Sequence, residues 1–257
     1  MGGLVRATPI RAMKVVRSRR PRSRVSTFID QDISCRNCGQ SWVRPVATFL
    51  DAPADLERAR AQLQSDTFQR FSCPGCGQRV IAARPLRWCD RQNRLWVAML
   101  PDAAETQWPR WERDVRTMAR WDIALDGTDP ADLSDWTIRL VFGLVALREK
   151  LISHQESLDD ATLEMLKLEL LDAHPGLERS ARSRLRLVDA GDTLLSFAAR
   201  DDQGRWQGAA ATRQRLKVIH DTPELWLTAR SSLLAGPYVD LGRMLVELPP
   251  GGGRDLR

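Results

Sequence analysis

The chain has 257 residues, of which 28% are charged and 43% hydrophobic, a composition typical of a globular protein of one or two domains. The formal net charge is +6, but residues 1–24 carry eight Arg and Lys residues and no acid, which leaves 31 basic against 33 acidic residues in the rest of the chain. The excess positive charge therefore belongs to a terminal segment and does not by itself indicate a nucleic-acid-binding domain.

We expect a disordered basic tail over residues 1–26 and a second disordered tail over 249–257. The basic tail lacks the apolar segment of a secretory signal, and the longest apolar run, LVFGLVAL at 140–147, is much shorter than a membrane span. We therefore expect a cytoplasmic protein with reduced cysteines. An organelle transit peptide stays open, and Met13 is a second possible start, so the tail need not belong to the native protein.

Residues 27–101 are predicted to form an N-terminal four-cysteine zinc-ribbon domain. Strand–turn–strand patterns surround both Cys-x-x-Cys pairs, and a short helix from about residue 53 lies between them. A hairpin follows over 86–99, with its turn at 90–93.

Residues 102–248 are predicted to form a C-terminal α+β region. A helix over 106–122 places Trp111, Val115 and Met118 on one face, and a buried apolar helix is expected over 136–153. A further helix over 159–173, three short strands after residue 183 and a last helix near 239–247 complete the chain. The predicted fold class is thus α+β: a zinc ribbon built from β-hairpins, then a helical segment, then a small β-rich region.

Four cysteines form two matched pairs, Cys35 with Cys38 and Cys73 with Cys76, each pair followed by a glycine. A two-residue gap lets both sulfurs of a pair point at one ion, and glycine tolerates the positive φ that the chain needs on leaving such a turn. Two such pairs can close a tetrahedral zinc site. Free thiols, a redox pair and two disulfides are the alternatives, and the paired spacing in a reducing compartment favours one structural zinc ion.

The fifth cysteine, Cys89, lies next to Trp88 in the predicted hairpin. We interpret it as a packed or partly exposed thiol and not as a fifth ligand.

From about Thr27 to Leu248 the sequence resembles the CpXC family of bacterial and archaeal proteins. The resemblance lies in CPGCG at 73–77, in the hairpin PLRWCDRQNRLWVAMLP, and in a helical stretch that contains Arg139, Glu149-Lys150 and Asp159-Asp160. Arg36 stands where the family name implies proline, and Trp88-Cys89-Asp90 stands where an aromatic-His-Asp triplet is expected. The resemblance implies a zinc-binding domain, and it implies no activity.

Apart from the metal ligands, we predict no catalytic or cofactor-binding residues. The sequence leaves open whether the chain is an enzyme, and it favours a protein without catalytic activity. Four thiolates leave zinc no open position for water. Glu149-Lys150 and Asp159-Asp160 could form a polar site, but we interpret them as a solvated helix end and an N-cap.

The sequence favours a zinc-stabilised interaction module whose partner is another, unidentified protein. The alternative is a nucleic-acid-binding zinc ribbon, because many arginines accompany Trp42, Trp88 and Trp96 near the cysteines. The basic tail alone predicts weak, salt-sensitive binding to nucleic acid. No membrane partner is expected.

Overall fold

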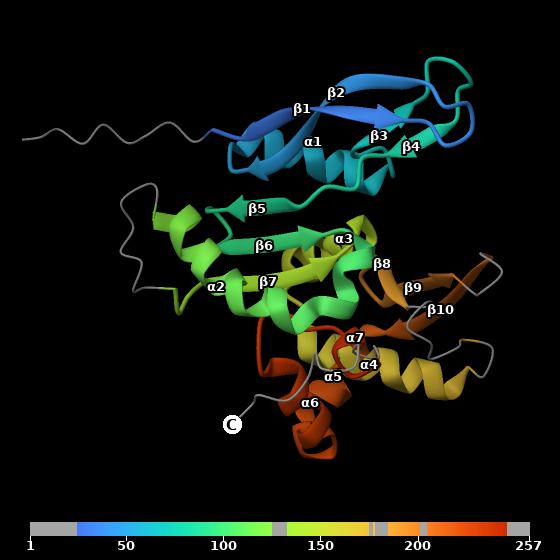
Figure 1. Ribbon diagram of the computed structural model, residues 1–257. Helices are drawn as coiled ribbons and strands as arrows, with labels where there is room; N and C mark the ends of the chain where they lie inside the picture. Colours follow the sequence, from blue (N-terminus) through green and yellow to red (C-terminus); the bar gives the residue numbers. More distant parts are fainter. Residues whose placement is uncertain (1–24, 125–132, 175–176, 178–184, 201–204, 246–257) are drawn as a thin grey trace, which may run out of the picture.

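The structure is a computed structural model that describes residues 25–124, 133–174, 177, 185–200 and 205–245. Almost all of the basic tail and the whole C-terminal tail predicted from the sequence lie outside these ranges. The described chain contains a five-stranded, a three-stranded and a two-stranded sheet together with several helices (Figure 1). The predicted α+β class is therefore confirmed.

The largest sheet has the strand order β1-β2-β5-β6-β7. Its strands are β1 (Thr27–Ser34), β2 (Ser41–Leu50), β5 (Leu86–Asp90), β6 (Leu95–Leu100) and β7 (Thr137–Phe142). The β1–β2 and β5–β6 pairs are antiparallel, whereas β2–β5 and β6–β7 are parallel. Strands from both sides of residue 101 thus share one sheet.

The smaller elements follow the chain around this sheet. Helices α1 (Pro53–Gln64) and α2 (Trp108–Ala124) precede β7, and α3 (Leu144–Gln155) and α4 (Asp160–Ala173) follow it. The two-stranded sheet consists of β3 (Arg70–Ser72) and β4 (Arg79–Ile81), and the meander of β8 (Arg186–Ala190), β9 (Leu194–Arg200) and β10 (Trp206–Thr212). The other helical segments are η1 (Asp102–Gln107), α5 (Arg213–Asp221), η2 (Pro223–Trp226), α6 (Leu227–Leu234) and α7 (Gly242–Leu245).

Helices cover both faces of the large sheet. On one face α1 and α3 pack against Trp88, Val97 and neighbouring residues. On the opposite face α2 packs through Val115, Ala119 and Ile123. Burial of apolar side chains on both faces accounts for the continuous buried run of β6.

A second large core lies among α4, the β8–β9–β10 meander, helices α5 and α6, and the following residues Val239 and Leu241. Figure 1 shows this part at the end of the molecule opposite β1 and β2. The helix expected over 159–173 is confirmed as α4, whose Leu163, Leu166 and Leu170 face this core.

The apolar helix expected over 136–153 was wrong in its first half, because residues 137–142 form strand β7. Ile138, Leu140 and Phe142 point into the α2-side core with the alternation of a strand. Gly143 has a φ of +82° and separates this strand from α3. The predicted order also needs correction, since β7 lies between helices and α5, η2 and α6 follow the meander.

The helix stripe of Trp111, Val115 and Met118 faces the core as expected. Val115 is fully buried, and Trp111 and Met118 are partly buried against the same cluster. The hairpin over 86–99 and the three short strands are confirmed as well.

Candidate metal centre

Two local turns of the same construction carry the four paired cysteines. In the first turn the Cys35 N–H donates to the Gln40 carbonyl at 2.9 Å, and the Gly39 N–H donates to the Cys35 carbonyl at 2.8 Å. The second turn repeats both bonds, from Cys73 to Gln78 and from Gly77 to Cys73, each at 2.9 Å. These bonds follow from the repeated Cys-x-x-Cys-Gly-Gln sequence.

The glycine that ends each turn has the conformation expected from the sequence. Gly39 has a φ of +75° and Gly77 a φ of +72°. Residues with a side chain adopt this left-handed region only at a cost in energy, whereas glycine has no Cβ that would clash. A glycine at this position therefore allows the chain to turn away from the cysteines.

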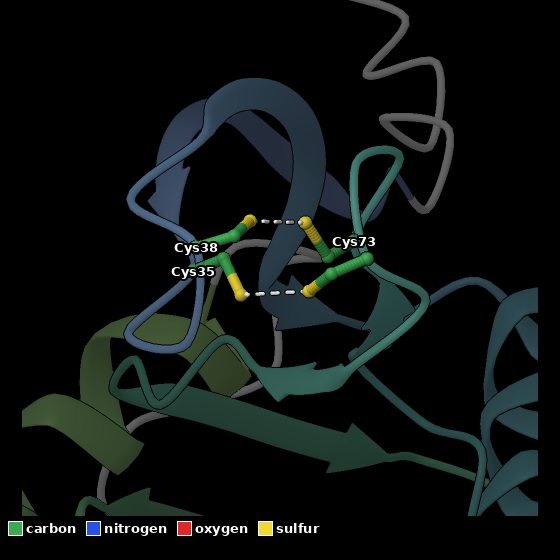
Figure 2. Close-up of side chains that lie close together, drawn as sticks. Cys35, Cys38 and Cys73 are labelled. Carbon is green, nitrogen blue, oxygen red and sulfur yellow. Dashed lines mark hydrogen bonds between the residues drawn. The ribbon is translucent and has the colours of Figure 1, made fainter.

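The fold brings the two turns together so that all four sulfurs meet (Figure 2). The Cys38 and Cys73 sulfurs are 3.4 Å apart, the Cys35 and Cys76 sulfurs 3.6 Å, and all four lie within 4.8 Å of one another. A tetrahedron of sulfurs about 2.3 Å from one zinc ion would have edges of roughly 3.8 Å. The arrangement is therefore compatible with a metal site.

The four cysteines differ in solvent exposure, and one of their sulfurs accepts a side-chain hydrogen bond. Cys35 and Cys73 are buried, whereas Cys38 and Cys76 are exposed. The Asn37 side-chain amide donates to the Cys76 sulfur at 3.4 Å. A hydrogen bond of this kind favours the thiolate, the form that binds metal.

Hydrogen bonds move the pKa values of Cys38 and Cys76 in opposite directions. The Asn37 amide, with the Gln78 backbone, lowers the pKa of Cys76 to about 6. The Gln40 backbone also lowers the pKa of Cys38, but hydrogen bonds with Cys73 and Cys76 raise it to about 12. Like charges at these distances resist joint ionisation, so four thiolates here require a cation.

The remaining cysteine, Cys89, lies in a different part of the fold from the four-cysteine cluster. Cys89 is fully buried in β5 within the core on the α2 side of the sheet, and among the described residues the candidate metal cluster consists of the other four cysteines. The interpretation of Cys89 as a packed thiol is confirmed.

A second concentration of charge lies between α3, α4 and the C-terminal elements, and its burial was not predicted. Glu149, Lys150 and Asp160 are almost completely buried, so the interpretation of this segment as a solvated helix end was wrong. Asp159 does cap α4, since its carboxylate accepts the Thr162 N–H at 2.8 Å. The other members of this buried charge network are Arg139, Glu164, Lys167, Arg186 and Asp240.

The burial of these charges is explained by their mutual pairing. The Lys167 ammonium contacts the carboxylates of Glu149 at 2.7 Å and Glu164 at 2.9 Å. Arg186 contacts Glu149 at 3.2 Å and also pairs with Asp240. Glu149, Glu164 and Asp240 lie close enough to hold a metal ion, but these cations already neutralise them. In the sequence, the i, i+3 spacing of Glu164 and Lys167 was the feature that could have indicated an ion pair here.

Helix α2 carries a third group that sequence reasoning missed, the arginines on its exposed side. Of the three tryptophans on which the nucleic-acid alternative was based, Trp88 and Trp96 are fully buried and Trp42 is partly buried. Several ribbon arginines are also engaged in ion pairs, among them Arg87 with Asp122 and Arg91 with Asp51. No helix in the described ranges has the length and apolar character needed to cross a membrane.

Fold and cluster together define an α+β protein with a four-cysteine candidate metal centre at one end of its main sheet. Residues 33–167, more than half of the chain, match the family described as CpXC protein. The chain belongs to the CpXC family. Comparisons with curated proteins and with solved structures gave no match.

Proposed function

We propose that this CpXC-family chain is a protein-interaction module whose ribbon is held together by one structural zinc ion. The observation that carries the proposal is the convergence of Cys35, Cys38, Cys73 and Cys76 from two hairpins onto one point. Four sulfur ligands select zinc or iron, and a closed set of four is typical of structural zinc.

The cluster is well placed to stabilise a small and otherwise weakly held part of the fold. The apolar cluster of the ribbon has just three buried members, Ile33, Val46 and Ala82, with three partly buried side chains against them. The cysteines connect β1 and β2 to β3 and β4, which pair only with each other. A metal ion would supply cohesion that so few apolar contacts provide poorly.

An interaction role is supported by apolar side chains exposed on the same ribbon. Phe28 is 48% exposed, Ile29 42% and Val43 51%. All three lie on the β1–β2 hairpin, whose strand β1 is the edge of the large sheet. Exposed apolar edges of this kind are uncommon unless a partner covers them.

Metal analysis of the purified full-length protein tests the zinc assignment. We expect one equivalent of zinc, its loss in Cys73→Ser and its retention in the matched variant Cys89→Ser. Because metal binding is linked to folding, Cys73→Ser should also increase amide exchange in β1 to β4. Zinc below about half an equivalent in protein purified without chelators, or iron in its place, would refute the assignment.

Isolation of the tagged chain from its native cells tests the interaction role. We expect a protein partner that remains bound through washing in salt and is lost when zinc is removed. A chain that is recovered alone, with zinc bound, would count against the interaction module and leave the zinc assignment intact.

A further inference from the structure

Helix α2 separates its charges into an acidic inner side and a basic outer side. Its sequence is almost balanced, with four arginines and three acidic residues between positions 110 and 122. Two acids are used inside the molecule: Glu112 pairs with Arg243, and the buried Asp122 pairs with Arg87. Only Asp114 remains as an exposed acid on the helix.

The arginines of α2 all lie on its exposed side. At 100° per residue, Arg113, Arg116 and Arg120 fall within a sector of about 60°, with spacings of about 4.5 and 6 Å along the helix axis. We call these three residues the arginine stripe. Within the described parts of the chain none of them has an acidic partner, in contrast to the paired Arg94 and Arg139.

A large aromatic side chain borders the stripe, about 100° around the helix from Arg120. Trp121 directly follows Arg120 and is 73% exposed, although most tryptophans of this chain are buried or partly buried. The helix lies on the face of β6 and β7 opposite α3, so its outer side points away from the core (Figure 1). Trp and Arg are the residues that most often dominate binding energy in protein interfaces.

We propose that the arginine stripe and Trp121 form a docking surface for a protein partner that presents a short helix with acidic residues and one apolar residue. Acidic residues three and four positions apart on a helix have the same spacing as the stripe. The apolar residue would cover Trp121. The inference rests on the proposed interaction role; it adds a second surface, on α2, to the exposed β1–β2 hairpin and names the chemistry of its partner.

A protein partner fits this surface better than nucleic acid. Residues 25–257 carry a net charge of about −2, and a zinc ion bound by four thiolates would add a further −2. Such a body repels a dense polyanion, whereas a short acidic helix contacts only the local positive charge. Platforms for single-stranded nucleic acid also use several stacked aromatic residues along a groove, and the stripe offers Trp121 alone.

Binding of labelled peptides to the full-length protein tests the proposal. One probe is a helical peptide with glutamates at i, i+3 and i+7 and a leucine beside them; the second replaces that leucine with serine. The variant Arg113→Gln/Arg116→Gln/Arg120→Gln removes the stripe. The control Arg44→Gln/Arg79→Gln/Arg84→Gln removes the same charge from exposed positions on the ribbon.

We expect the stripe variant to weaken binding of the leucine peptide about tenfold, and the control variant less than about twofold, because three local contacts are lost only in the first. Trp121→Ala should weaken binding of the leucine peptide and leave the serine peptide unchanged. Equal losses in the two triple variants, or no binding of either peptide to the wild type, would overturn the proposal.

Two further outcomes would assign the surface to another ligand. Loss of oligonucleotide binding in the stripe variant alone, without peptide binding, would identify a nucleic-acid surface. Peptide binding that begins only after replacement of the aspartates at 126, 129 and 132 by asparagine would show that the chain's own acidic segment occupies the stripe. Loss of zinc, or recovery of the chain without a partner, would contradict the proposed function without affecting these peptide measurements.

Discussion

Replacement of Glu149 by glutamine tests whether the buried charge network is held by electrostatic balance. One Glu149 oxygen accepts hydrogen bonds from Lys167 at 2.7 Å and Arg186 at 3.2 Å, and the other accepts the Leu187 N–H at 2.6 Å. Glutamine has the same shape but no charge. The change therefore leaves the buried cations with one positive charge in excess.

The network as a whole sets the expected size of this effect. Its described members are four acids and four bases: Glu149, Asp160, Glu164 and Asp240 against Arg139, Lys150, Lys167 and Arg186. Removal of one partner from a buried ion pair typically costs about 3–5 kcal/mol. We expect Glu149→Gln to lower the free energy of unfolding by that amount at pH 7.

Urea unfolding followed by tryptophan fluorescence measures the change, with the slope on urea concentration checked for constancy. The matched control is Glu169→Gln, since Glu169 lies on α4 and pairs with Arg215 at the surface. Its expected cost is below about 1 kcal/mol.

A double-mutant cycle separates charge imbalance from lost packing. Lys167→Met added to Glu149→Gln restores neutrality, so the double variant should be more stable than the sum of the single changes predicts. A cost below about 1 kcal/mol for Glu149→Gln, or strict additivity in the cycle, would refute the electrostatic account.

Two further substitutions test the backbone conformation of the ribbon and the acid–base properties of the buried charge network. Gly39→Ala should destabilise the ribbon by about 1–2 kcal/mol, because φ at this position is +75°; Gly39→Asn should cost less, since asparagine tolerates this region. A chelator-competition assay of metal affinity measures both, and equal affinity of wild type and Gly39→Ala would contradict the reasoning. Lys150 and Arg139 outweigh burial and hold the pKa of Asp160 below its usual value of 3.8, so its contribution to stability is present above about pH 4 and lost on further acidification. In Asp160→Asn the pH dependence of the free energy of unfolding should flatten below pH 4.

What could be predicted from the sequence was encoded locally. The Cys-x-x-Cys-Gly turns contain their own hydrogen-bond pattern, and Gly39 and Gly77 have the positive φ that their position indicated. The hairpin over 86–99 and the capping of α4 by Asp159 depend equally on neighbouring residues. In each case the partner groups lie within about fifteen residues of one another in the sequence.

What could not be predicted depends on contacts between distant segments. Residues 137–142 are apolar enough for a buried helix or a buried strand, and the parallel pairing with β6 decides between them. The burial of Glu149 depends on Arg186, thirty-seven positions away. Likewise, the near-neutral composition of α2 conceals the arginine stripe, because the inward pairing of Glu112 requires Arg243 from the C-terminal region.

The buried charge network therefore extends beyond the segment that matches the family. The match stops at residue 167, within α4, yet Glu164 of that segment accepts the Leu241 N–H at 3.0 Å and Glu149 accepts Arg186 and the Leu187 N–H. Without the later residues these buried carboxylates would lose donors, and an unpaired buried charge is among the most costly defects in a protein. The C-terminal region thus completes the electrostatic balance of the family segment, and Arg243 of the same region pairs with Glu112 on the inner side of α2.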